Sequence, residues 1–280
     1  MLEPKYDEIG YWSEIKLDII KDYAAAYSRI LSSQKKPSLY HIYIDAFAGA
    51  GKHISKKTGK FVLGSPMNAL LVKPPFQEYH FIDLDQQKIA SLEEIAGSRQ
   101  DVHIYHGDCN HVLLEKVLPN AKYKDYRRAL CILDPYGLHL NWKVIHTAGQ
   151  MKSIDIFLNF PVADMNRNVL LRKPDEVSPV QIKRMIQFWG DESWRQVAYL
   201  PSKQRKLFGD ADIEKASNEK IAEAFRKRLK KVAGFGNVPE PIAMRNSQNA
   251  VVYYLFFASH KLVAEDIINF IFDKYKDRRG

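Results

Sequence analysis

Short hydrophobic runs that end in, or shortly before, an acidic or polar residue recur along the first 160 residues. These runs are residues 42–45, 79–83, 102–105, 129–134 and 154–160. Their length and their β-branched and aromatic content predict buried strands. Residues 85–96, 110–118 and 141–151, between them, predict helices. Strands that alternate with helices predict an α/β fold, a mostly parallel, doubly wound sheet with helices on both faces.

The other segments are predicted to extend this core and to add a lobe. Residues 12–33, 217–232 and 261–274 have the apolar spacing of amphipathic helices, and residues 241–245 and 251–257 predict a β-hairpin. Residues 161–216 break the alternation with prolines and many basic residues, among them Lys203, Arg205 and Lys206. We expect a Rossmann-like core over 1–160, an inserted basic helical lobe over 161–216 that serves as lid or substrate-recognition element, and completion of the core over 217–280.

Composition and charge narrow the class of protein. The chain has 280 residues, of which 46% are hydrophobic, and this is ample for one large core. A net charge of +9 favours polyanionic partners, nucleic acid first, although an ordinary basic cytosolic protein remains an alternative. The two cysteines, Cys109 and Cys131, fit a reducing compartment. With neither a signal-peptide pattern nor an apolar run of membrane-spanning length, we expect a soluble, cytoplasmic protein without a membrane partner.

The small residues that follow the first predicted strand indicate a ligand-binding turn. The turn is Ala48-Gly49-Ala50-Gly51, where the backbone can approach a ligand closely. A phosphate-binding P-loop is disfavoured, because Ala46 and His53 stand where it needs glycine and serine or threonine. A nicotinamide or flavin turn lacks its third glycine at Ile54, and an enzyme of that kind stays a weaker alternative. Residues 52–60 predict a basic loop, and Ser65 the N-cap of the next helix.

Asp45-Ala46-Phe47-Ala48-Gly49-Ala50-Gly51 resembles the cofactor motif of DNA and RNA methyltransferases, in which Phe-x-Gly-x-Gly follows the first strand. The resemblance implies S-adenosylmethionine as cofactor, with Asp83 on the ribose hydroxyls and Asp108 near the adenine amine. Asp83 or Asp85 can also be read as a helix cap, and we expect Asp85 to be the cap. The predicted cofactor-binding residues are Asp45, Phe47, Gly49, Gly51, Asp83, Leu84, Asp108 and Cys109.

Asp134-Pro135-Tyr136-Gly137 stands at the place of the Asp-Pro-Pro-Tyr-like motif of amino-group methyltransferases, with Tyr136 in place of the second proline. A carboxylate there can accept the N–H bonds of an exocyclic amine, and Tyr136 can stack on an extruded base. The alternative is a strand end and a proline turn, with Tyr136 in the core. Cys131 lies inside the strand, which argues against carbon methylation, and no histidine spacing predicts a metal site. The predicted catalytic residues are Asp134, Pro135, Tyr136 and Asn159, and the residues predicted to hold substrate phosphates are Lys52, Lys56, Lys57 and Arg167.

Over about residues 10–275 the chain is similar to the three-Cys-motif partner protein family. The shared features include Gly64-Ser65-Pro66, Gly107-Asp108-Cys109-Asn110 and Leu158-Asn159-Phe160-Pro161. The resemblance implies a methyltransferase-like fold and a partner that resembles radical S-adenosylmethionine enzymes, without naming a substrate. The leading hypothesis is therefore an S-adenosylmethionine-dependent methyltransferase that modifies an exocyclic amino nitrogen of a nucleic acid. The alternative is a non-catalytic binding module that serves the radical-enzyme-like partner.

Overall fold

A seven-stranded sheet forms the centre of the protein. The computed structural model describes residues 6–201, 213–276 and 278. The strand order is β11-β12-β8-β7-β2-β5-β6, and β12 runs antiparallel to both of its neighbours while the other pairs are parallel. The strands are β2 (Tyr40–Asp45), β5 (Glu78–Asp83), β6 (Val102–His106), β7 (Arg127–Leu133), β8 (Ile154–Phe160), β11 (Ile242–Arg245) and β12 (Val251–Ala258). The predicted mostly parallel sheet with a C-terminal β-hairpin strand is confirmed.

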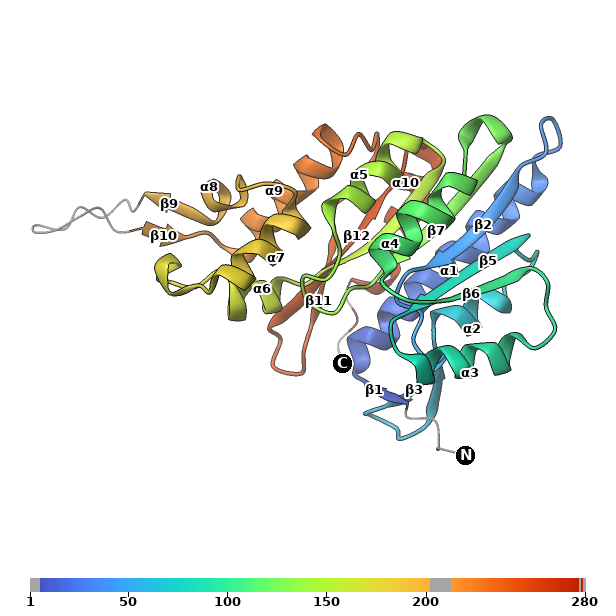
Figure 1. Cartoon of the computed structure of the whole chain (residues 1–280), viewed down its shortest axis with the longest axis horizontal. Coiled ribbons are helices and arrows are strands. Elements are labelled where there is room, and N and C mark those ends of the chain that lie inside the picture. Colours follow the sequence, from blue (N-terminus) through green and yellow to red (C-terminus); the bar gives the residue numbers. More distant parts are fainter. Residues whose placement is uncertain (1–5, 202–212, 277, 279–280) are drawn as a thin grey trace, which may run out of the picture.

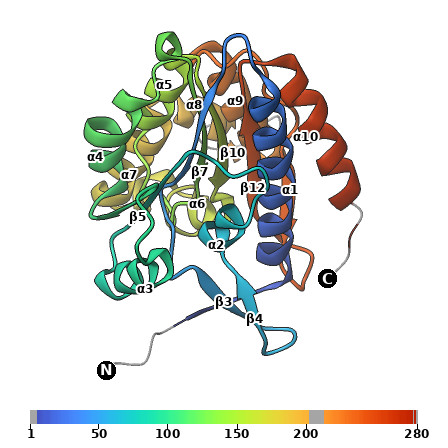
Figure 2. The same ribbon diagram turned by 90° about the vertical axis from the view of Figure 1, so that its right-hand side faces the viewer.

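Helices cover both faces of this sheet, as Figures 1 and 2 show. One face carries α1 (Tyr11–Ser33), α2 (Ser65–Leu70), α3 (Gln86–Ala96) and α10 (Leu262–Tyr275), and the other carries α4 (Cys109–Val112), α5 (Trp142–Met151) and α9 (Asn218–Lys231). Alternation along β2 explains the two cores, since Ile42 and Ile44 belong to one hydrophobic cluster and Tyr43 to the other. Because β2 is buried on both faces, neither face needs polar side chains, and this explains its continuous run of hydrophobic residues.

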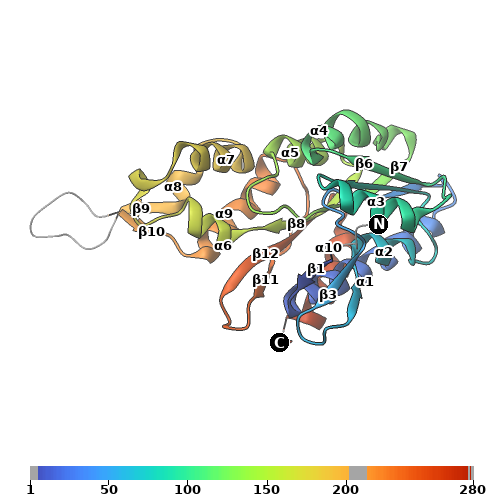
Figure 3. The same ribbon diagram turned by 60° about the horizontal axis from the view of Figure 1, so that its bottom comes forward.

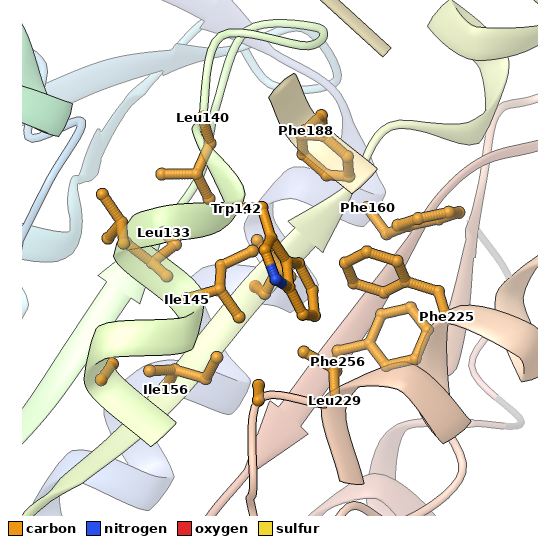
Figure 4. Close-up of a cluster of buried hydrophobic side chains, with 14 of the residues drawn as sticks. Leu133, Leu140, Trp142, Ile145, Ile156, Phe160, Phe188, Phe225, Leu229 and Phe256 are labelled. Carbon is orange, nitrogen blue, oxygen red and sulfur yellow. The ribbon is translucent and has the colours of Figure 1, made fainter. Parts of the chain in front are cut away.

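The segment after β8 contains α6 (Val162–Asn168), a 3₁₀ turn (Pro174–Glu176), α7 (Pro179–Trp189), α8 (Trp194–Ala198), β9 (Tyr199–Pro201) and β10 (Ile213–Lys215). It lies at the end of the molecule opposite α3 (Figures 1 and 3). Figure 4 shows Phe188 of α7 beside Phe160 and Phe225, with ring centroids 5.9 and 5.7 Å away. These aromatic contacts fix α7 to the sheet and to α9. The basic residues Lys203, Arg205 and Lys206 lie outside the described residues.

A small second sheet replaces part of the predicted basic loop. Lys52–Ser55 forms β3, which pairs in parallel with β1 (Asp7–Ile9) and antiparallel with β4 (Phe61–Leu63). Figure 2 shows β3 and β4 beyond one edge of the large sheet, below α2. The loop prediction was wrong for residues 52–55. This short basic segment becomes a strand only because it pairs with β1, in which Asp7 lies opposite His53, some 45 residues later in the chain.

Two helix boundaries also differ from the predictions. The N-cap of α2 is Gly64, and Ser65 is already inside the helix. The helix predicted over 110–118 is regular only to Val112, after which Leu113–Val117 form a π-helical turn. Gly64 is extended and its Cβ would lie 3.0 Å from the Gly51 backbone, so close approach of these two segments favours glycine there.

Candidate functional site

A cavity of about 370 Å³ lies at the carboxyl ends of the parallel strands. The turn after β2, the end of β5, the loop after β7 and the first turns of α1 surround it. Because β2, β5, β7 and β8 run in the same direction, their carboxyl ends meet at this edge. The predicted site residues that line it are Phe47, Gly49, Lys56, Asp83, Asp134, Pro135, Tyr136 and Asn159.

Asp83 connects the end of β5 to the glycine turn after β2. Its Oδ2 accepts a hydrogen bond from the Gly49 backbone N–H at 2.8 Å, and its Oδ1 accepts one from the Asp85 N–H at 2.9 Å. Gly49 has a φ of +64°, a conformation that favours glycine. Asp85 caps α3 by accepting from the N–H groups of Gln87 and Lys88, as predicted. Asp83 is therefore free of the capping role and orients the glycine turn toward the cavity.

Asp134 is held by two side chains from distant parts of the chain. Lys16 of α1 contacts Asp134 Oδ2, and Asn159 of β8 donates from Nδ2 to Asp134 Oδ1 at 2.7 Å. The Lys16 residue is 9% exposed, and the Asp134 side chain keeps 31% of its surface exposed. Burial alone would lower the pKa of Lys16, but the Asp134 carboxylate beside it raises that pKa well above the ordinary lysine value. Lys16 thus stays protonated at neutral pH.

Asn159 carries a further acceptor beside Asp134. Its Oδ1 is buried and has no hydrogen-bond partner among the described residues. A buried amide oxygen without a partner is costly, so a donor from an ordered water or from a ligand would stabilise it.

Sequence reasoning missed Lys16. It was not among the predicted site residues, yet it is buried between Ile15 and Leu17. Its position in the sequence could have indicated this role. Lys16 lies in the second turn of α1, the helix that precedes β2 and packs antiparallel to it. The beginning of such a helix lies at the carboxyl edge of the sheet, where Asp134 also lies.

Three segments meet at the mouth of the cavity. Lys88 of α3 donates to Asp7 Oδ2 of β1 at 2.6 Å, and the Tyr136 hydroxyl lies 3.4 Å from the same oxygen. The Lys88 ammonium is 5.6 Å from the centre of the Tyr136 ring. Tyr136 is 69% exposed, so the alternative prediction that placed it in the core was wrong. Its exposed ring at the mouth leaves a face for a planar ligand.

Asp45 and Gly51 were predicted to bind the cofactor and are not among the residues that line the cavity. Asp45 is fully buried and accepts from the Phe47 N–H at 3.2 Å, and burial raises its pKa to about 7. Gly51 has a φ of +79°, and a Cβ there would lie 2.7 Å from Ile95 Cδ1 of α3. Both residues therefore shape the turn that presents Gly49.

The predicted residues near β6 also lie outside the cavity. Asp108 Oδ1 accepts from the Asn110 backbone N–H at 2.7 Å and so caps α4. Cys109 is buried, and burial raises the pKa of its thiol to about 12, while Leu84 is 73% exposed. Of the three predicted carboxylates Asp83, Asp108 and Asp134, the cavity is lined by Asp83 and Asp134.

The four residues predicted to hold phosphates are dispersed. Lys56 lines the cavity. Lys52 lies within β3, and the Lys57 ammonium is 5.3 Å from the ring centre of Tyr11. Arg167 is exposed on α6, outside the cavity. Of these four residues, only Lys56 therefore lines the cavity.

Residues 6–201, 213–276 and 278 contain no group of three or more histidine, cysteine or acidic side chains placed to hold a metal ion. Within the described part of the chain, no helix is both long and apolar enough to cross a membrane. Cys109 and Cys131 are both buried, free thiols.

Comparisons with known proteins found structures with a similar fold but no matching family. No protein-family model and no curated protein matches the sequence, so membership in the three-Cys-motif partner family stays a prediction. A Legionella pneumophila protein of the DUF519 family has a similar crystal structure, with a TM-score of 0.53 and 10% identity over 93% of this chain and 92% of that one. The similarity concerns the fold alone, a Rossmann-like α/β arrangement around a mostly parallel sheet.

Two further structures are more distant. A putative methyltransferase from Thermobifida fusca has a TM-score of 0.42 and 13% identity, over 87% of this chain and 81% of that one. A putative S-adenosylmethionine-dependent methyltransferase from Listeria monocytogenes has a TM-score of 0.43 and 10% identity, over 85% of this chain and 98% of that one.

Proposed function

We propose that this protein is an S-adenosylmethionine-dependent methyltransferase that modifies an exocyclic amino nitrogen of a nucleic acid. The observation that carries the proposal is the cavity in which Asp83, Asp134 and the Gly49 backbone meet. Its volume of about 370 Å³ lies within the range of small-molecule sites. A methyl transfer needs two ligands, and the cavity offers the Asp83 carboxylate to the cofactor and the Asp134 carboxylate to the methyl acceptor.

The cavity residues fit the cofactor in charge and in hydrogen-bonding capacity. Each Asp83 oxygen accepts one backbone N–H, and a carboxylate has about four acceptor positions, so two remain for ribose hydroxyls. Both carboxylates and ammonium groups line the wall, among them Asp7, Asp83, Lys16 and Lys56. This mixture suits a zwitterionic ligand that also bears a sulfonium. When bound, S-adenosylmethionine supplies the methyl group.

The group around Asp134 suits an amine as methyl acceptor. An exocyclic amine is a weak nucleophile because its lone pair is delocalised into the ring. The Asp134 carboxylate and the unpartnered Asn159 Oδ1 are acceptors for its two N–H bonds, an arrangement that localises the lone pair on nitrogen. The neighbouring Pro135 carbonyl is a further acceptor, and the ion pair with Lys16 fixes the position of the Asp134 carboxylate. Most of the rate enhancement would come from this positioning.

Two features favour a nucleic acid over a small amine. The chain carries a net charge of +9, and the exposed Tyr136 ring lies at the cavity mouth, where an extruded base can stack. Stacking on an aromatic side chain contributes about 1–3 kcal/mol per base. Lys56 at the rim, with Lys52, Lys57 and Arg167 farther out, would interact with the phosphates.

The proposal is tested by measuring cofactor binding and methyl transfer separately. Isothermal titration with S-adenosylmethionine should show binding, and Asp83→Asn should weaken it about 10-fold or more, because a charge-assisted hydrogen bond contributes about 1.5–3 kcal/mol. Asp266→Asn, an exposed substitution on α10, is the matched control. Asp134→Ala should retain binding and lose transfer of labelled methyl to RNA and single-stranded DNA. A wild type that does not bind the cofactor refutes the proposal, and binding without transfer to any nucleic acid indicates a non-catalytic module.

A further inference from the structure

A second cavity of about 280 Å³ adjoins the first. It lies between the loop after β7 and the helices α6 and α7. Tyr136 lines both cavities, so the two are neighbours on either side of this residue. The residues of the second cavity that matter here are Gly137, His139, Asp164, Asn168, Gln181 and Arg184.

The wall of this cavity holds polar groups without protein partners. The side chains of His139, Gln181 and Arg184 make no hydrogen bond or ion pair within the part of the chain that the structure describes. Arg184 is half-buried, so its guanidinium is in part shielded from solvent. These groups can donate to an anion and to the edge of a heterocycle.

Asp164 presents an acceptor to the same space. Its Oδ1 accepts from Asn168 Nδ2 at 2.8 Å. Its Oδ2 lies 2.8 Å from the position that a Cβ on Gly137 would take, and Gly137 has a φ of +57°. Glycine at 137 therefore lets the loop backbone pass beside a carboxylate that keeps one oxygen available.

The helix that carries Arg184 and Gln181 is firmly held. Ser178 caps α7 by accepting from the Gln181 N–H, and Met185, Phe188 and Trp189 are buried in the core. Figure 4 shows Phe188 directed at Phe160 and Phe225. The polar side of α7 is thus presented to the cavity at a fixed distance from the loop after β7.

We propose that this second cavity binds the nucleotide adjacent to the methylated one in a single-stranded nucleic acid. The inference rests on the proposed function and names a substrate subsite for it. Arg184 binds the phosphate between the two nucleotides, and Asp164 with Gln181 recognises the base edge. An exocyclic amine offers two N–H donors to the Asp164 carboxylate, whereas uracil and thymine offer only the ring N3–H, so a base with an exocyclic amine is preferred. A volume near the lower limit of about 300 Å³ for ligand sites leaves room for about one nucleotide.

The test is direct binding of fluorescein-labelled 12-nucleotide single strands, oligo(A) and oligo(U) as RNA and oligo(A) and oligo(T) as DNA, followed by anisotropy. Arg184→Gln should weaken binding to oligo(A) about 10-fold. It should also reduce the slope of log affinity against log salt by about 0.7, the value for one lost phosphate contact on a single strand. Lys183→Gln, one position away on the same helix and exposed, is the control and should leave both nearly unchanged. Asp164→Asn should reduce the preference for oligo(A) over oligo(U) or oligo(T).

The outcomes separate this inference from the proposed function. If the wild type methylates nucleic acid but Arg184→Gln binds and methylates as Lys183→Gln does, the inference is overturned and the proposed function stands. If oligonucleotides bind in an Arg184-dependent way without methyl transfer, the subsite stands and catalysis fails. If the wild type binds none of the four strands, both are overturned. A difference between the RNA and DNA arms identifies which polymer the subsite accepts.

Discussion

Replacement of Lys16 by methionine tests the electrostatic arrangement of the site. Methionine preserves much of the side-chain volume in a position that is 9% exposed, but it removes the charge that faces Asp134. Removing one partner of a buried ion pair costs about 3–5 kcal/mol, because the other charge stays buried. Asp134 keeps 31% of its side chain exposed and retains the Asn159 bond, so we expect a smaller loss, about 2–3 kcal/mol.

The loss should be nearly independent of pH between 6 and 9. Asp134 raises the pKa of Lys16, so the folded state holds this proton more tightly than the unfolded state. The stabilisation is complete below the unfolded lysine value of about 10.4 and is lost only as the pH rises above it. Urea unfolding followed by circular dichroism at pH 6, 7 and 9 measures this, with the midpoint read at an unchanged m-value.

Two variants control the interpretation. Lys173→Met removes an exposed ion pair with Glu176 and should change stability by less than about 0.5 kcal/mol. Combining Lys16→Met with Asp134→Asn should recover part of the loss, because no unpaired charge then remains at the site. If Lys16→Met costs no more than Lys173→Met, Lys16 does not pair with Asp134 in the folded protein and the account of the site is wrong.

Three further predictions concern the scaffold around the site. Gly51→Ala should destabilise the protein by about 1–2 kcal/mol more than Gly59→Ala in the same urea assay, because both positions have a positive φ but only at Gly51 does the added Cβ clash with Ile95. Burial raises the pKa of Asp45 to about 7, so stability should fall as the pH rises from about 4 to about 7, and Asp45→Asn should remove that dependence in unfolding curves measured across this range. Phe225→Ala should cost about 3–5 kcal/mol in chemical denaturation, because this ring packs between the sheet and the lobe helices, and a loss below 1 kcal/mol would contradict that packing.

Local sequence patterns were sufficient for the large sheet and for part of the site. Each strand of the core is a hydrophobic run whose length and end are encoded within about seven residues, and neighbours in a parallel sheet align their ends. Asp83 and Asp134 close such runs, so their approach to one cavity could be predicted without knowing the rest of the chain. The cap at Asp85 was predictable for the same reason, since capping depends on residues two and three positions away.

The partners of these residues were decided by the tertiary structure. Lys16 meets Asp134 across 118 positions, and β3 becomes a strand by pairing with β1, so neither contact has a local signature. Asp108 has the same local pattern as Asp83, but its carboxylate turns to cap α4 and lies outside the cavity. A short hydrophobic run determines which element forms and where it ends. Which charged side chains pair with one another depends on how distant helices and strands pack. No single segment of the sequence encodes that packing.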